Sequence, residues 1–199
     1  MEQKDSLCKS FSYRPIDLVI KARMMHRSYK PEADFDLGQL VYIEALHYDF
    51  KGQVKTGELV VNRSIAKDLL AVLRELFDAK YPIEKMVLID EYDADDDLSM
   101  GDNNSSAFNY RTIAGTNQLS NHAKGLAIDI NPLYNPYIQV RNGKTNVYPQ
   151  NGLCYTNREL DNPYFIRKDD VCYTTFLKYG FTWGGDWSPS KDYQHFEHK

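Results

Sequence analysis

The chain has 199 residues, of which 42% are hydrophobic and 26% charged, and this length and composition are typical of one globular domain with its own core. The formal net charge is −4 and no basic cluster is present, so nucleic acid is not an expected partner. The apolar runs are too short to span a membrane, and residues 1–14 lack the apolar core of a secretory signal.

The first part of the chain predicts a short helix followed by a β-hairpin. Apolar residues between positions 15 and 25 favour a short helix within residues 1–39, which we interpret as an N-terminal extension to a main domain at 40–199. Residues 40–50 and 53–62 have the composition of strands, and Lys51-Gly52 between them indicates a hairpin turn. We interpret His47, within the first strand, as a packing or surface residue.

Residues 64–80 carry the clearest helical pattern, with Ser64 as a candidate N-cap and Pro82 beyond the end. Its apolar residues recur at helical spacing: Ile65, Leu69, Val72, Leu73, Leu76 and Phe77. The apolar run in 85–92 predicts a buried strand. The acidic run 93–97 does not fit a calcium-binding EF-hand loop, because the sixth and twelfth positions hold Leu98 and Asn104. We interpret this run as part of a solvated loop.

The segment 120–130 carries the first candidate site. Leu126, Ile128 and Ile130 alternate with Ala127 and Asp129, which predicts a short strand that projects Asp129 opposite its apolar face. Gly125 permits a sharp turn between His122 and this strand. A lone histidine or aspartate of this kind is more often a solvated loop residue or an edge charge. A second Asp/His pair downstream favours a functional interpretation.

The second half of the chain begins with a long polar segment, 131–168, which we interpret as a loop that lines one side of a cleft. Residues 169–179 predict a helix with Val171, Phe176 and Leu177 inward and Gly180 at its end. Trp183 and Trp187 either wall the cleft or pack in the core. The cysteines are Cys8, Cys154 and Cys172; a disulfide between the last two and three unpaired thiols are both open.

Asp192-Tyr193-Gln194-His195 supplies the second pair. With His122 and Asp129, His195 completes a set of two imidazoles and one carboxylate, which suits a single zinc ion with one open, catalytic position. Asp192, three residues before His195, is close enough to accept a proton from the attacking water. Glu197 is the alternative carboxylate for that role, and His198 is interpreted as a surface residue.

Several motifs together resemble those of the zinc D-alanyl-D-alanine carboxypeptidases, a family that includes vancomycin-resistance D,D-carboxypeptidases and phage L-alanyl-D-glutamate endolysins. They are Ser-x-His-x-x-Gly-x-Ala-x-Asp at 120–129, Trp-Gly-Gly-x-Trp at 183–187, Asp-x-x-His at 192–195, Thr-Gly-Glu-Leu-Val-Val at 56–61, Phe-Asn-Tyr-Arg at 108–111, Ala-Gly-Thr at 114–116 and Asp-Ile-Asn-Pro at 129–132. The resemblance runs from about residue 40 to residue 196. It implies zinc ligands His122, Asp129 and His195, a catalytic carboxylate at Asp192, and Arg111 as the group that binds substrate.

We therefore expect a single-domain α+β fold in which helices pack on a small antiparallel sheet, as in the hedgehog and D-Ala-D-Ala peptidase folds. The expected activity is zinc-dependent hydrolysis of the terminal D-Ala-D-Ala bond of the peptidoglycan stem peptide, with Arg111 holding a carboxylate or the developing oxyanion and with Ser120 and Trp183 as further substrate contacts. Hydrolysis of the L-Ala-D-Glu bond is the alternative enzyme activity.

Two non-enzymatic alternatives remain at this point: a zinc-containing binding module, as in hedgehog-type signalling domains, and a metal-free structural domain. The presence of Asp192 favours the enzyme, because a non-catalytic zinc site does not need that carboxylate. A cell-wall substrate implies a protein of the cell envelope or a secreted protein from which a leader has been removed, with the cytoplasm as the other possibility.

Overall fold

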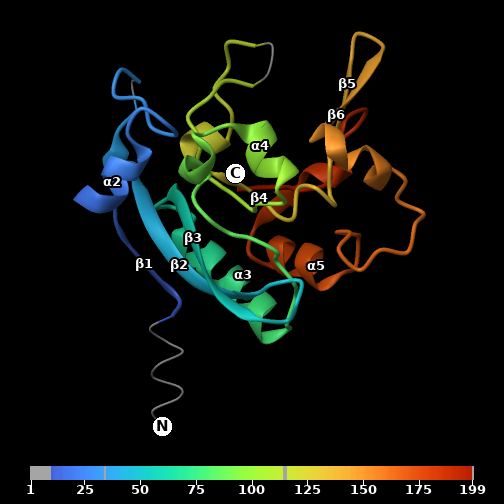
Figure 1. Ribbon diagram of the computed structural model, residues 1–199, viewed down its shortest axis with the longest axis horizontal. Helices are drawn as coiled ribbons and strands as arrows, with labels where there is room; N and C mark the ends of the chain where they lie inside the picture. The colour runs from blue at the N-terminus through green and yellow to red at the C-terminus, as the bar shows by residue number, and fades with distance from the viewer. Residues whose placement is uncertain (1–9, 34, 114–115, 199) are drawn as a thin grey trace.

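The computed structural model describes residues 10–33, 35–113 and 116–198, so Cys8 and the Ala114-Gly115 pair of one motif lie outside the described residues. The described chain forms three small antiparallel sheets of three strands each, with helices packed against them (Figure 1). This is the expected α+β class. Within the described ranges, none of the helices has the length and apolar character needed to cross a bilayer.

The first sheet has the order β1-β2-β3, with β1 at Ser12–Pro15, β2 at Leu40–Tyr48 and β3 at Val54–Asn62. The predicted hairpin is therefore confirmed, and a single 3-10 turn, η1 (Leu37–Gln39), precedes it. Side chains of β2 alternate between two apolar clusters, because successive residues of a strand point to opposite faces. Both faces of β2 are thus covered.

Helix α3 (Ala66–Asp78) packs against one face of β2, and its predicted apolar stripe is buried except for the half-buried Phe77. The short helix α2 (Leu18–Met24), also predicted, contributes Ile20 and Met24 to the cluster on the other face (Figure 1). The predicted Ser64 cap is wrong: the N-cap position of α3 is Ile65, and Ser64 instead binds the Asn62 side chain. The predicted boundary between residues 39 and 40 stays a prediction.

The predicted strand at 85–92 is wrong, although Met86, Leu88 and Ile89 of its apolar run are buried. The side chain of Asn104 satisfies both backbone groups of Val87, accepting from its N–H at 2.9 Å and donating to its carbonyl at 3.1 Å. A side-chain amide thus takes the place of a neighbouring strand. The segment ends in a 3-10 turn, η2 (Ile89–Tyr92).

The acidic run 93–97, which the sequence predicts to be part of a solvated loop, instead leads into a helix. The Asp95 side chain accepts a hydrogen bond from the Leu98 N–H at 3.0 Å and caps helix α4 (Asp96–Gly101). Three consecutive aspartates therefore lie at the start of a helix, where negative charge is favourable.

The second sheet has the order β4-β9-β7 and carries two of the three predicted metal ligands, Asp129 and His195. Its strands are β4 (Ala127–Asp129), β9 (His195–His198) and β7 (Phe181–Trp183). Helix α5 (Val171–Lys178) packs on it through Phe176, which stacks on Phe196. The inward positions of α5 are Cys172, Thr175 and Phe176. The predicted inward residues Val171 and Leu177 are exposed, because they lie on the other side of the helix.

The third sheet corrects the interpretation of 131–168 as a loop. Strands β5 (Tyr137–Arg141) and β6 (Lys144–Tyr148) form a hairpin that projects from the body of the molecule, and a 3-10 segment, η4 (Gln150–Thr156), follows (Figure 1). Asn142 and Gly143 both have positive φ at the turn, as expected for an Asn-Gly hairpin. The short strand β8 (Lys191–Asp192) pairs with β5 and completes the sheet.

The two described cysteines are free thiols, Cys154 exposed and Cys172 buried. His47 is buried in the first sheet and its ring nitrogen Nδ1 lies 2.7 Å from the carbonyl oxygen of Ile83, which confirms a packing role.

Candidate active site

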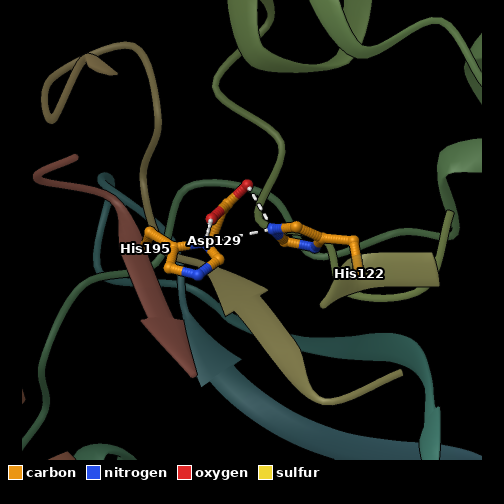
Figure 2. Close-up of side chains that lie close together, drawn as sticks. All are labelled: His122, Asp129 and His195. Atoms are coloured by element: carbon orange, nitrogen blue, oxygen red, sulfur yellow. Dashed lines mark hydrogen bonds and ion pairs between the residues drawn. The ribbon is translucent and has the colours of Figure 1, made fainter. Parts of the chain in front are cut away.

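Three predicted ligands, His122, Asp129 and His195, come together from three separate elements (Figure 2). His122 begins the 3-10 turn η3 (His122–Lys124), Asp129 ends β4, and His195 begins β9. Asp129 and His195 are directly opposite each other in the antiparallel pair of strands. All three residues are at most 8% exposed. One potential ligand atom from each lies within 4.8 Å of the other two.

The atoms that face one another are Nε2 of His122, Nδ1 of His195 and the carboxylate of Asp129. The two nitrogens are 3.1 Å apart. Oδ2 of Asp129 lies 3.3 Å from the His122 nitrogen and Oδ1 lies 3.1 Å from the His195 nitrogen. Figure 2 shows the carboxylate between the two imidazole rings. These are the donor types of a zinc site with three protein ligands.

The turn that carries His122 is fixed by its neighbours. The Oγ atom of Ser120 accepts a hydrogen bond from the Ala123 N–H at 3.1 Å. Gly125 ends the turn with φ of +69°, and a Cβ atom there would lie 2.5 Å from the backbone nitrogen of Asn62 in β3. Only glycine permits this conformation together with this approach. Nδ1 of His122 donates to the Ala107 carbonyl at 2.6 Å, which leaves Nε2 as the free ligand atom.

The charges of the cluster favour a bound cation. Burial alone would raise the pKa of Asp129, but His122 and His195 outweigh it and hold this pKa well below its usual range. Burial would lower the pKa of His195, but hydrogen bonds to Asp129 and Glu197 raise it to about 10. The negative charge that raises the pKa of His195 also favours a divalent metal ion in place of the proton. The three ligand atoms and the negative charge around them therefore fit a zinc ion.

Asp192 lies beside this cluster, on β8 opposite Tyr137 of β5. Burial raises the pKa of its carboxyl to about 7, with a further contribution from the negative charge of Asp129. Its Oδ1 atom is buried and has no hydrogen-bond partner among the described residues. A Cβ atom on Gly184 of the 3-10 turn η5 (Gly184–Asp186) would lie 2.6 Å from the Asp192 carbonyl, so the Trp-Gly-Gly motif lets this turn approach β8.

The cluster opens into a cleft of about 410 Å³. One wall contains Tyr137, Gln139 and Tyr148 of the β5–β6 hairpin, so part of the 131–168 segment lines the cleft as predicted. The lining also contains Arg111 and the acidic start of α4. A second hollow, of about 390 Å³ beside the β2–β3 hairpin, contains none of the predicted site residues.

The predicted substrate-contact residues lie in different surroundings. Arg111 and Ser120 line the cleft. Trp183 is only 4% exposed and packs in the core, where its Nε1 donates to the Tyr193 carbonyl at 2.9 Å. Trp187, which is 37% exposed, is the tryptophan that lines the cleft. His198 is half-buried against Phe181 rather than on the open surface.

Sequence reasoning missed two contacts around the site. Asp96 forms an ion pair with Arg111, and Glu197 contacts the outer nitrogen of His195. The spacing of Glu197, two residues after His195 on a strand, is the signal that places both side chains on one face. Nothing in the local sequence around Asp96 indicates its partner.

A comparison with known families agrees with this geometry. Residues 114–198 match the family model described as D-alanyl-D-alanine carboxypeptidase. No curated protein and no solved structure matches the chain. The matched residues include His122, Asp129, Asp192 and His195, whereas Arg111 precedes them. Residues 114–198 of this chain are therefore a domain of the D-alanyl-D-alanine carboxypeptidase family of metallopeptidases.

Proposed function

We propose that the protein is a zinc peptidase that hydrolyses the terminal D-Ala-D-Ala bond of peptidoglycan stem peptides in the cell envelope. The observation that carries this proposal is the juxtaposition, in one cleft, of the His122, Asp129 and His195 cluster with the unpartnered carboxyl of Asp192. A binding module does not need such a carboxyl, with a pKa raised to about 7, beside its metal ligands.

His122, Asp129 and His195 hold the metal in this proposal. Zinc, when bound, supplies a Lewis acid that lowers the pKa of water toward ~7 and polarises the scissile carbonyl. Asp192 accepts the proton from the attacking water as the new C–O bond forms. It then passes this proton to the leaving amine as the C–N bond breaks, so the carboxylate is regenerated at the end of each turnover.

Arg111 binds the substrate carboxylate that lies next to the scissile bond. Its Nε atom faces Asp96, so the terminal nitrogens of the guanidinium are the remaining donors for a ligand. A planar pair of donors matches a carboxylate. Because the D-Glu residue of the stem also offers a carboxylate, an L-Ala-D-Glu endopeptidase is the second candidate.

The test is digestion of purified muropeptides that end in D-Ala-D-Ala, with the products analysed by mass spectrometry. The proposed carboxypeptidase releases one alanine, and the endopeptidase releases the rest of the stem. The protein should contain one zinc ion, and the activity should disappear with a chelator and return with zinc. Asp192→Asn is the matched control, because it keeps the shape of the side chain. A zinc-loaded protein that cleaves neither bond would overturn the proposal.

A further inference from the structure

His195 has a carboxylate on each side of its ring. Nδ1 faces Asp129 Oδ1 at 3.1 Å, and Nε2 faces Glu197 Oε2 at 3.2 Å. A neutral imidazole carries one proton, so the partner that accepts this proton decides which nitrogen is free to bind a metal. Nδ1 is the nitrogen next to Nε2 of His122, at 3.1 Å. The proton must therefore lie on Nε2, where Glu197 accepts it.

The carboxylate of Glu197 is itself held in place. Asn121 Nδ2 donates to the same Oε2 atom at 2.6 Å. Glu197 lies two residues after His195 on β9, and its opposite residue on β4 is the fully buried Ala127. Asn121 immediately precedes His122 in the chain. The Asn121–Glu197 hydrogen bond therefore connects the segment that carries one predicted ligand to the strand that carries another.

We propose that Glu197, held by Asn121, is a positioning residue that fixes the proton of His195 on Nε2 and so presents Nδ1 to the metal. This role rests on the proposed zinc site. It differs from the role of Asp192, because Glu197 contacts the nitrogen that points away from the cluster, whereas Asp192 has an unpartnered oxygen beside it. A carboxylate in this position also makes the imidazole a stronger ligand.

Zinc affinity is the direct test, measured by competition with a chromophoric chelator in Glu197→Ala, Glu197→Gln and Asn121→Ala. Loss of such an outer partner typically weakens metal affinity about 10–100-fold, and we expect Glu197→Ala to fall in this range. Glu197→Gln keeps an oxygen acceptor without the charge, so its loss should be smaller. Asn121→Ala should weaken affinity in the same direction. The absorption spectrum of the cobalt(II)-substituted protein should change in Glu197→Ala, because the ligand geometry changes.

Asp97→Asn is the matched control, because Asp97 is an exposed carboxylate that lines the same cleft. It removes one negative charge, and its zinc affinity should stay close to that of the wild type. Circular dichroism of the metal-free variants shows whether they fold. If Glu197→Ala does not fold, the zinc affinity of Glu197→Gln still tests the proposal.

The outcomes separate this role from the proposed function. Wild-type protein that binds no zinc overturns the zinc site and the positioning role together. Zinc-binding wild type with unchanged affinity in both Glu197 variants overturns the positioning role alone. If, in addition, turnover collapses in those variants at saturating zinc, Glu197 is the proton acceptor and Asp192 is not.

Discussion

Arg111 and Asp96 form an ion pair in the lining of the cleft, and neither residue is fully exposed. Asp96 is the first residue of α4, and its Oδ1 atom also accepts a hydrogen bond from Asn109 Nδ2 at 3.1 Å. The Asn109 amide in turn donates to the Ala94 carbonyl. The arginine that we propose to bind substrate is thus oriented by a carboxylate that the Asn109 amide holds in place.

We expect Asp96→Asn to raise KM several-fold for a peptide with a free terminal carboxylate and to change kcat little. The loss of the anchoring charge frees the Arg111 side chain, and binding must then order it again. The same peptide with an amidated terminus serves as the control, since it should be insensitive to the substitution. A fall in KM would show that Asp96 competes with substrate for the arginine instead.

Arg111→Lys keeps the charge but loses the planar pair of donors. We expect kcat/KM to fall about tenfold or more, which corresponds to about 1.4 kcal/mol, with the melting temperature unchanged. Steady-state kinetics and thermal unfolding measure the two effects. Near wild-type turnover in Arg111→Lys would show that the arginine acts only as a point charge, and Arg111→Ala then tests whether the charge matters.

Asp192 and His195 are three residues apart but should behave differently when replaced. His195→Ala removes a ligand, so zinc affinity and activity should fall together. Asp192→Asn should keep its zinc while the rate falls by about 10²–10⁴-fold, the usual contribution of general acid–base catalysis. Zinc content and single-turnover rates distinguish the two variants. Loss of zinc from Asp192→Asn would make Asp192 a ligand and would put the role of Asp129 in doubt.

The stability of the metal-free protein should fall as the pH rises. Hydrogen bonds to Asp129 and Glu197 outweigh burial and raise the pKa of His195 from 6.5 to about 10. Its stabilisation is complete below pH 6.5 and is lost as the pH rises through about 10. Burial raises the pKa of Asp192 from 3.8 to about 7. The stabilisation from its protonated carboxyl is therefore complete below pH 3.8 and is lost as the pH rises through about 7.

Thermal unfolding of chelator-treated protein between about pH 5 and pH 9 measures this effect. The depressed pKa of Asp129 acts in the opposite direction, but only below its usual value of 3.8, so it does not mask the trend. His195→Ala should flatten the upper part of the curve. A melting temperature that rises with pH in the metal-free wild type would contradict these protonation states of His195 and Asp192.

Gly125→Ala tests whether the turn that carries His122 needs glycine. An alanine with positive φ costs about 1–2 kcal/mol by itself. At Gly125 the new methyl group would also lie 2.5 Å from the Asn62 nitrogen. Gly52→Ala is the matched control, because Gly52 has φ of +72° and nothing within 4 Å of the added carbon. Gly125→Ala should lose clearly more stability than Gly52→Ala in denaturant unfolding, together with zinc affinity; equal losses would exclude a steric role.

Local periodicity determined the elements whose partners are near in sequence. The two strands on either side of Lys51-Gly52 are joined by a short turn, and the apolar face of α3 packs against them. The local sequence pattern, the hydrogen bonds and the burial therefore all favour the same structure. The sequence motifs likewise identified His122, Asp129 and His195, because two histidines and one aspartate are ligand types that suit zinc.

Hydrogen-bond partners that are distant in sequence were decided only by the tertiary structure. The apolar run at 85–92 reads as a strand, but the backbone of Val87 pairs with the side chain of Asn104. The Asn142-Gly143 turn is a local hairpin signal, yet the pairing of β5 with β8 joins segments that are distant in sequence. The sequence by itself determines which side chains are apolar and which can bind a metal. Only the folded chain determines that Asp96 reaches Arg111 and that Glu197 reaches His195, because these contacts depend on how separate elements pack.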